Sequence, residues 1–241
     1  MSLQKYKNYP LIENKLDTPQ YDLFRECQVE IIKSRLAPYY NEGYQYAEIY
    51  HLVNVIEWLY NLDWQPTRIL DVGAAYGTLA LFCRKKFNCS VFATDFIDRP
   101  SLSFLKVLGE LEDVQTNNIE TSALPWKHKF DIILLTEVLE HFNFHPAETL
   151  VKINKALSDQ GILILTTPDA DSWGRAKRYK SLEEMPLYKE GIGILDQHNC
   201  QYTKRELLHL LKASKFNVLT LEYSPGATAR QFNILATKYD T

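Results

Sequence analysis

The sequence predicts an α/β protein with a seven-stranded, mostly parallel sheet, a C-terminal antiparallel hairpin and helices on both faces. Three observations support this fold class. Short apolar runs alternate with helical segments through the middle of the chain, as in parallel sheets with crossover helices. The first of these runs, residues 69–72, ends in a glycine turn that opens a helix. Two β-rich runs, 216–223 and 231–239, flank Ser224-Pro225-Gly226 and predict the closing hairpin.

The N-terminal part of the chain, residues 1–66, is expected to form a helical cap. Residues 1–20 are polar and contain two prolines, so we expect an irregular arm there. Apolar residues then recur at helical spacing over 22–36 and 47–62. Pro38 and Gly43 separate these two helices, and Pro66 closes the second.

The remaining residues, 67–241, are predicted to form the core around the sheet. Strands are expected at 69–72, 90–95, 113–117, 131–135 and 161–166, with helices at 79–87, 104–111, 146–157 and 203–213. Residues 169–200 interrupt this alternation with a polar and aromatic stretch. Connections of this length are usually lids or binding elements, so we expect an insertion that covers a binding site and contacts its ligand.

Composition restricts the classes of function. With 46% hydrophobic and 24% charged residues, the 241-residue chain is an ordinary globular protein. A net charge of -3 gives no overall attraction to nucleic acid, which would need a local basic patch. The four cysteines form no C-x-x-C pair, which fits a reducing cytoplasm rather than a disulfide or zinc framework. We expect a cytoplasmic protein without a signal peptide or a membrane span.

The glycine turn carries the sharpest chemical signal. Residues Asp71-Val72-Gly73-Ala74-Ala75-Tyr76-Gly77 follow a strand and open a helix, so a ligand can approach the backbone closely. Asp95 ends the next strand, where a carboxylate can accept both hydroxyls of a ribose. A nicotinamide cofactor would require G-x-G-x-x-G for its diphosphate, whereas this turn is G-x-x-x-G. Asp71 would repel a diphosphate and attract an ammonium group, so the residues favour S-adenosylmethionine as the cofactor.

These segments resemble the class I S-adenosylmethionine-dependent methyltransferases, in particular their small-molecule type 11 group. The resemblance covers roughly residues 68–240. Its motifs occur in the expected order: Ile69 to Gly77, Asp95, Asn118-Ile119-Glu120 ahead of Leu124-Pro125-Trp126, Asp131 to His141, Gly161 to Pro168, and the helix after Tyr202-Thr203. It implies a Rossmann-like fold and an enzyme that transfers a methyl group.

The resemblance also implies a cofactor site. Its expected residues are Asp71, Gly73, Ala74, Ala75 and Gly77 around the methionine end, Asp95 at the ribose, Phe96, Ile97, Asn118 and Ile119 at the adenine, and Thr136 and Glu137 beside the sulfonium. Two positions depart from the family. Ala75 replaces the usual glycine, which is tolerable if its φ is negative or the cofactor is set back. Asn118 replaces a frequent aspartate and can accept a hydrogen bond from the adenine amino group through its oxygen.

Two histidines are candidates for catalysis on the acceptor side. His141 lies at the carboxyl edge of the sheet and could act as a general base, with a structural or capping role as the alternative. His198 precedes Tyr202-Thr203, where related enzymes often have a histidine near the active site. A His141–His145 metal pair lacks a third ligand, so no metal is expected.

Aromatic and polar residues around these histidines are expected to contact the acceptor. They are Tyr46, His145, Trp173, Arg175 and Tyr188. The basic run at 175–180 is either solvated surface or a binding site for a phosphate or carboxylate of the acceptor.

The sequence therefore predicts methyl transfer to an oxygen or nitrogen of a small molecule, such as a natural product, a sugar or a nucleotide-sugar. The alternatives are an RNA methyltransferase, an inactive S-adenosylmethionine-binding partner protein, and a nucleotide-dependent oxidoreductase or epimerase. The oligomeric state is not predicted.

Overall fold

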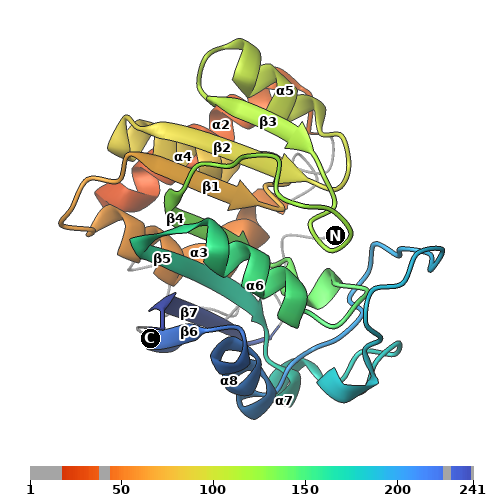
Figure 1. The fold of residues 1–241 in the computed structure, drawn as a ribbon. Coiled ribbons are helices and arrows are strands. Elements are labelled where there is room, and N and C mark those ends of the chain that lie inside the picture. The colour runs from red at the N-terminus through yellow and green to blue at the C-terminus, as the bar shows by residue number, and fades with distance from the viewer. Residues whose placement is uncertain (1–17, 38–43, 225–228, 240–241) are drawn as a thin grey trace.

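The computed structural model describes residues 18–37, 44–224 and 229–239. Within these ranges the strands form a seven-stranded sheet in the order β3-β2-β1-β4-β5-β7-β6 (Figure 1). The strands are β1 (Arg68–Val72), β2 (Ser90–Asp95), β3 (Asp113–Thr116), β4 (Phe130–Thr136), β5 (Leu157–Pro168), β6 (Phe216–Ser224) and β7 (Gln231–Lys238). The first five are parallel, and β7 pairs antiparallel with both β5 and β6. The predicted fold class is therefore confirmed.

The helices alternate with these strands along the chain. They are α2 (Pro19–Ser34), α3 (Tyr44–Tyr60), α4 (Thr78–Phe87), α5 (Pro100–Val107), α6 (Ala147–Ala156), α7 (Ala170–Trp173) and α8 (Lys204–Ala213), with short 3-10 turns η3 (Leu139–His141) and η4 (Leu182–Glu184). Helix α5 starts before the position expected from sequence, because Pro100 is well suited to a first helical turn. Among the described helices, none combines the length and the apolar character that crossing a membrane would require.

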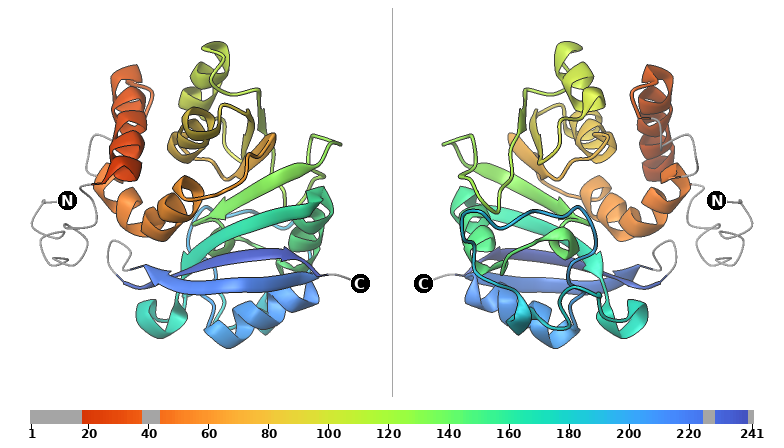
Figure 2. Two further views of the ribbon diagram at one scale, coloured as in Figure 1. Left: turned by 90° about the vertical axis from the view of Figure 1, so that its left-hand side faces the viewer. Right: turned by 90° about the vertical axis from the view of Figure 1, so that its right-hand side faces the viewer.

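Helices cover both faces of the sheet (Figure 2). Alternating side chains of the central strands build two hydrophobic cores, one on each face. On one face, Ile69, Ile132, Leu134, Ile162 and Ile164 pack with residues of α2, α3, α4 and α5. On the other face, Leu70, Ile133, Leu135, Leu163 and Leu165 pack with residues of α6 and α8. Successive residues of a strand point to opposite faces, so a continuous apolar run is buried on both sides. This explains why these strands lack an alternating polar pattern.

The two N-terminal helices belong to the first of these layers. Helix α2 packs on α4 and α3, and α3 packs against β5, β6 and β7. Asn54 and Ser224 fix α3 to the sheet, since the Asn54 amide donates to Tyr223 O at 3.2 Å and the Ser224 hydroxyl donates to His51 O at 3.1 Å. The segment expected as a cap therefore shares a core with the sheet. Most of the expected arm, residues 1–17, lies outside the described residues, as do Pro38, Gly43 and the hairpin turn at 225–228.

The insertion at 169–200 is mostly irregular and contains α7 and η4. Its end is tied to the turn after β4, because Asn199 N–H donates to Glu140 O at 2.7 Å and the Asn199 amide donates to His141 O at 2.8 Å. Part of the insertion projects from the body of the molecule beside α6 (Figure 1). Leu187 and Leu195 are 66% and 49% exposed there, which leaves apolar surface next to the carboxyl edge of the sheet.

Candidate functional site

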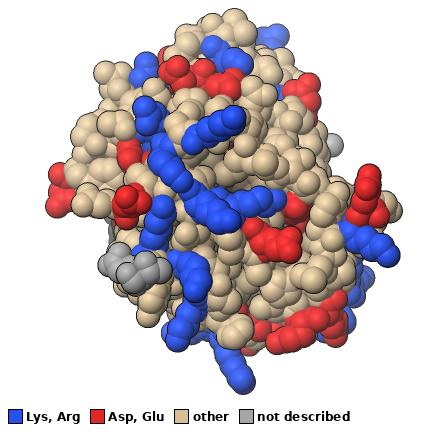
Figure 3. All heavy atoms as spheres, in the orientation of Figure 1, with Lys and Arg blue, Asp and Glu red and all other residues tan. Residues whose placement is uncertain are grey.

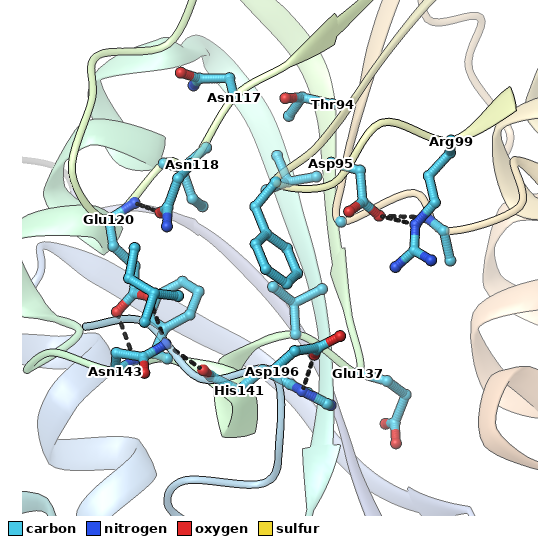
Figure 4. Close-up of a pocket in the computed structure, with 18 of the residues that line it drawn as sticks. Thr94, Asp95, Arg99, Asn117, Asn118, Glu120, Glu137, His141, Asn143 and Asp196 are labelled. Atoms are coloured by element: carbon cyan, nitrogen blue, oxygen red, sulfur yellow. Dashed lines mark hydrogen bonds and ion pairs between the residues drawn. The ribbon is translucent and has the colours of Figure 1, made fainter. Parts of the chain in front are cut away.

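A cavity of about 310 Å³ opens at the carboxyl ends of the parallel strands (Figure 4). The ends of β1, β2 and β4, the loop after β3 and the insertion all contribute to its wall. A smaller pocket of about 40 Å³ adjoins it, and both are lined by Tyr44, Gly73, Ala75 and Glu137. Open α/β sheets bind their ligands at this edge, so this pair of cavities is the candidate site.

The glycine turn after β1 forms the floor between the two cavities. Gly73 N–H donates to Thr94 O at 2.7 Å, which fixes the turn to β2. The backbone of Gly73 has a φ of +73°, and a Cβ there would lie 2.3 Å from Val138 Cγ2. Gly77, at φ +87°, caps the N-terminus of α4. Glycine is therefore required at position 73 for both its conformation and the space around it.

Ala75 occupies the same turn with a left-handed backbone. Its φ is +47°, so the negative φ that would make an alanine comfortable there is not present. Its N–H donates to Asp95 Oδ2 at 3.0 Å, which helps to hold the strained turn. A non-glycine residue in this conformation costs about 1–2 kcal/mol. Strain of this kind is often found where a backbone is shaped for a ligand.

Asp95 ends β2 with both carboxylate oxygens in use and its side chain on the wall of the main cavity. Oδ1 accepts from Ile97 N–H and Oδ2 from Ala75 N–H, each at 3.0 Å. Arg99 Nε lies 3.5 Å from Oδ2 and also lines the cavity. A carboxylate oxygen can accept a further hydrogen bond, so the geometry leaves room for two hydroxyl donors. Arg99 belongs to no motif in the sequence, where it stands between Asp98 and Pro100.

The loop after β3 brings Asn118 and Glu120 to the opposite wall. Asn118 Oδ1 accepts from Glu120 N–H at 2.8 Å. This oxygen can accept one further hydrogen bond, and the amide NH₂ adds a hydrogen-bond donor on the same side chain. A hydrogen-bond donor at this place suits a ring nitrogen of adenine, which accepts hydrogen bonds. Glu120 Oε1 accepts from the N–H groups of Asn143 and Phe144 at 2.7 and 2.8 Å, so its carboxylate shapes the wall (Figure 4).

The smaller pocket is lined by three carboxylates, those of Glu48, Asp71 and Glu137. Asp71 is 1% exposed, and its Oδ1 has no hydrogen-bond partner. Burial, followed by the charges of Asp95 and Glu48, raises the pKa of Asp71 to about 7. The carboxylate expected from sequence is present, but in the folded protein it takes up a proton near neutral pH. A cation in this pocket would favour the charged form.

Glu137 follows β4 with a φ of +54° and points into both cavities. Its Oε2 lies 2.8 Å from His51 Nδ1, whereas its buried Oε1 has no hydrogen-bond partner. His51 reaches this place from α3, far from Glu137 in the sequence. The unpartnered oxygens of Asp71 and Glu137 fit the ammonium and sulfonium groups of S-adenosylmethionine, because buried carboxylates need a donor or a cation.

The two candidate catalytic histidines lie side by side. His141 lines the main cavity, and its ring centroid is 4.9 Å from that of His198. His141 Nδ1 lies 3.2 Å from Asp196 Oδ1 (Figure 4). Burial lowers the pKa of both imidazoles, while Asp196 acts in the opposite direction on His141. Trp173 packs on His198 at 5.6 Å between ring centroids.

Other residues expected at the acceptor lie outside both cavities. His145 does not share a helical face with His141, because η3 ends at His141 and Phe142 has an extended ψ of 135°. His145 N–H donates instead to Pro186 O. Tyr46 is 46% exposed on α3, Tyr188 packs on Phe144, and Arg175 pairs with Glu206 at 2.8 Å.

Of the residues expected at the cofactor, Phe96 and Ile119 line the main cavity, and Ala74 and Thr136 line the smaller pocket.

Two asparagines that the sequence did not single out connect the cavity wall to the insertion. Asn143 is 2% exposed, accepts from Leu195 N–H at 2.8 Å and donates to His141 O at 3.2 Å. The Asn199 amide donates to the same carbonyl of His141. Arg178 also donates to the oxygens of both asparagines. Single asparagines in loops carry no periodic signal, so only the folded chain reveals this junction.

A family model described as a methyltransferase domain matches residues 23–221. The chain belongs to the methyltransferase-domain family. The match begins in α2 and ends in β6, so it includes α3 and most of α2 as well as the five parallel strands of this methyltransferase. The predicted family and the predicted enzyme class are confirmed. A comparison with curated proteins found no match.

Solved structures of low sequence identity share the fold of this methyltransferase. The 1,6-didemethyltoxoflavin-N1-methyltransferase of Burkholderia thailandensis, with bound 1,6-didemethyltoxoflavin and S-adenosylhomocysteine, is 19% identical with a TM-score of 0.56, and the match covers 88% of this chain and 89% of that chain. The O-methyltransferase of a Brevibacillus brevis trans-AT PKS multienzyme, in complex with S-adenosylhomocysteine, is 12% identical with a TM-score of 0.55, over 72% and 67% of the two chains. The [4+2]-cyclase SpnF is 14% identical with a TM-score of 0.57, over 81% and 82%. The predicted cofactor agrees with the first two structures.

Proposed function

We propose that this methyltransferase transfers the methyl group of S-adenosylmethionine to an oxygen or nitrogen of a small organic acceptor. The observation that carries the proposal is the small pocket beside the glycine turn. There Asp71 Oδ1 and Glu137 Oε1 are buried without hydrogen-bond partners. Buried oxygens of this kind destabilise the protein unless a ligand binds to them. The methionine end of S-adenosylmethionine, with its ammonium and sulfonium groups, would do so.

The rest of the cofactor would extend from this pocket into the main cavity. Asp95 would accept the ribose hydroxyls, and Asn118 would donate to the adenine ring between Phe96 and Ile119, all of which line that cavity. When bound, S-adenosylmethionine supplies a methyl group that is already activated. The protein then contributes orientation and the exclusion of water.

The acceptor would bind between the turn after β4 and the insertion. His141, Asn143, Ile194 and Leu195 line this part of the cavity. Apolar walls with a few convergent polar groups suit an organic molecule. We propose that the insertion, residues 169–200, covers the acceptor, and that His141 and His198 act on it. The four cysteines are buried thiols, which supports a cytoplasmic setting.

One observation keeps RNA as a second candidate acceptor. Figure 3 shows Lys and Arg side chains in a band across the middle of the face that carries α6. The basic run at 175–180 adds little, because Arg175 and Arg178 are engaged by Glu206, Asn143 and Asn199. Salt-sensitive binding of a short RNA would favour this candidate, because phosphate contacts weaken steeply with salt.

Titration calorimetry with S-adenosylhomocysteine and, separately, with NAD⁺ tests the cofactor part of the proposal. We expect binding of the first ligand and none of the second, since a diphosphate would face Asp71 and Glu137. Binding of NAD⁺ alone would contradict the proposal. A methyl-transfer assay across small alcohols, phenols and amines then separates an active enzyme from an inactive binding protein with the same pocket. The assay is needed because the fold alone does not decide the reaction, as the similar structure of the [4+2]-cyclase SpnF shows.

A further inference from the structure

Glu140, His141 and His198 bring three metal-binding side chains together next to the acceptor cavity. One donor atom from each residue lies within 4.8 Å of the other two. Glu140 and His141 come from η3 after β4, and His198 comes from the end of the insertion. Donors that bind one tetrahedral cation at about 2.0–2.2 Å lie about 3.3–3.6 Å apart, so the side chains would have to close in by about 1 Å on binding.

The buried carboxyl of Glu140 independently points to a ligand here. Glu140 is 1% exposed and lines neither of the two cavities. One oxygen, Oε2, accepts from the Thr167 hydroxyl at 3.0 Å, whereas Oε1 has no hydrogen-bond partner. Glu140 is therefore not among the residues proposed above to hold the cofactor. A buried carboxyl oxygen without a partner is rare and costly, and a cation between Glu140 and the two histidines would satisfy it.

The two imidazoles are already oriented through their other nitrogen atoms. His141 Nδ1 lies 3.2 Å from Asp196 Oδ1, and His198 Nδ1 lies 3.1 Å from the Gln201 amide. Nε2 is then the nitrogen that each ring offers to a ligand. Gln201 Oε1 has no partner, and rotating this amide would let it accept from His198 Nδ1–H. Metal-binding histidines are typically held in this way by a carboxylate or a carbonyl oxygen.

We infer that Glu140, His141 and His198 bind one divalent metal ion at the acceptor side of the cavity. Two imidazoles and a carboxylate suit Zn²⁺, Mn²⁺, Fe²⁺ or Co²⁺. In the sequence, His145 was the possible second metal ligand beside His141. In the folded chain, His198 and Glu140 lie beside His141 instead. Glu137 is close enough to act on all three groups, and Asp196 on both histidines, so their negative charges also favour a cation.

A cation here would make His141 a ligand rather than a general base, because Nε2 cannot bind a metal and a proton together. The metal would hold an oxygen of the acceptor and favour loss of its hydroxyl proton to the solvent. This role rests on the proposed methyl transfer, whereas metal binding itself does not. The two can therefore be tested separately.

The test measures metal binding in the full chain without cofactor or acceptor. After treatment with EDTA and dialysis, Zn²⁺ and Mn²⁺ are titrated separately by calorimetry, and Co²⁺ is followed by its visible absorption. We expect one ion per chain. His141→Ala and His198→Ala should each weaken binding at least about tenfold. The matched controls are His145→Ala and the exposed His209→Ala, which should bind like the wild type.

Absence of a wild-type site for these ions, or equal affinity in all four variants, would overturn the inference. Glu140→Gln adds a test of the buried ligand, with circular dichroism to check that it folds. Binding of S-adenosylhomocysteine is measured on the same samples. If that ligand binds and no metal does, the metal site fails and the proposed methyl transfer stands. If a metal binds and S-adenosylhomocysteine does not, the metal site stands and the proposed function fails.

Discussion

Replacing Asp71 by asparagine should stabilise the protein and weaken cofactor binding at the same time. Asp71 is buried, and its pKa rises from 3.8 to about 7 on folding, mainly through loss of solvation. Below about pH 4 the group is protonated in both states. Between pH 4 and 7 the unfolded chain releases the proton and the folded chain keeps it, so stability falls as the pH rises. Above pH 7 the folded protein carries the full cost of the buried charge.

The magnitude follows from the two pKa values. A folded-state pKa that is higher by about three corresponds to about 4 kcal/mol of lost stability at high pH. Asparagine has nearly the same shape as aspartate and cannot ionise. Its amide still leaves buried polar atoms at this position, so we expect about 2–4 kcal/mol of added stability at pH 8.5 and almost none at pH 4.

Urea unfolding at pH 4, 6, 7 and 8.5 compares the wild type with Asp71→Asn. The exposed Asp98→Asn serves as the control and should show no such trend. Calorimetry on the same proteins should show at least tenfold weaker binding of S-adenosylhomocysteine to Asp71→Asn, because the ammonium group loses an anionic partner. Wild-type affinity should also fall below pH 7, as Asp71 becomes protonated. Equal stability of the two proteins at pH 8.5, or a gap that widens toward acid, would refute this reasoning.

Four further substitutions test the site. Ala75→Gly should raise the free energy of unfolding by about 0.5–1 kcal/mol, because the left-handed strain is lost while the glycine adds freedom to the unfolded chain; a lower melting temperature would contradict this. Gly73→Ala should abolish binding of S-adenosylhomocysteine and lower the melting temperature more than the control Gly109→Ala. Gly73 and Gly109 both have a positive φ, but a Cβ at Gly109 meets nothing within 4 Å. Asp95→Ala should weaken that binding at least tenfold by calorimetry, and unchanged affinity would remove Asp95 from the site. His141→Ala should lower turnover much more than cofactor affinity, whether the imidazole is a base or a metal ligand, and equal turnover would exclude both roles.

Local patterns in the sequence were enough to predict the layers of the fold and the edge of the sheet that carries the candidate site. Apolar runs of four to six residues mark strands buried on both faces, because strand side chains alternate with a period of two. The glycine turn predicts a close backbone approach, since only glycine fits position 73. Asp95 ends β2 and Glu137 follows β4, and both strands pair in parallel with β1, so the order of elements implied that these two residues lie at the same edge of the sheet.

Contacts between distant segments decided the rest. Strand β7 lies between β5 and β6, and His51 lies beside Glu137. Both arrangements depend on how whole layers of the fold pack together. His198 reaches His141 because the asparagine junction ties the insertion to η3, whereas the spacing of His141 and His145 suggested a helix that the chain does not form. Burial, which sets the pKa of Asp71, is likewise a property of the whole fold. Spacing along a chain specifies which side chains share a face, but only tertiary packing specifies which faces meet and how much water remains between them.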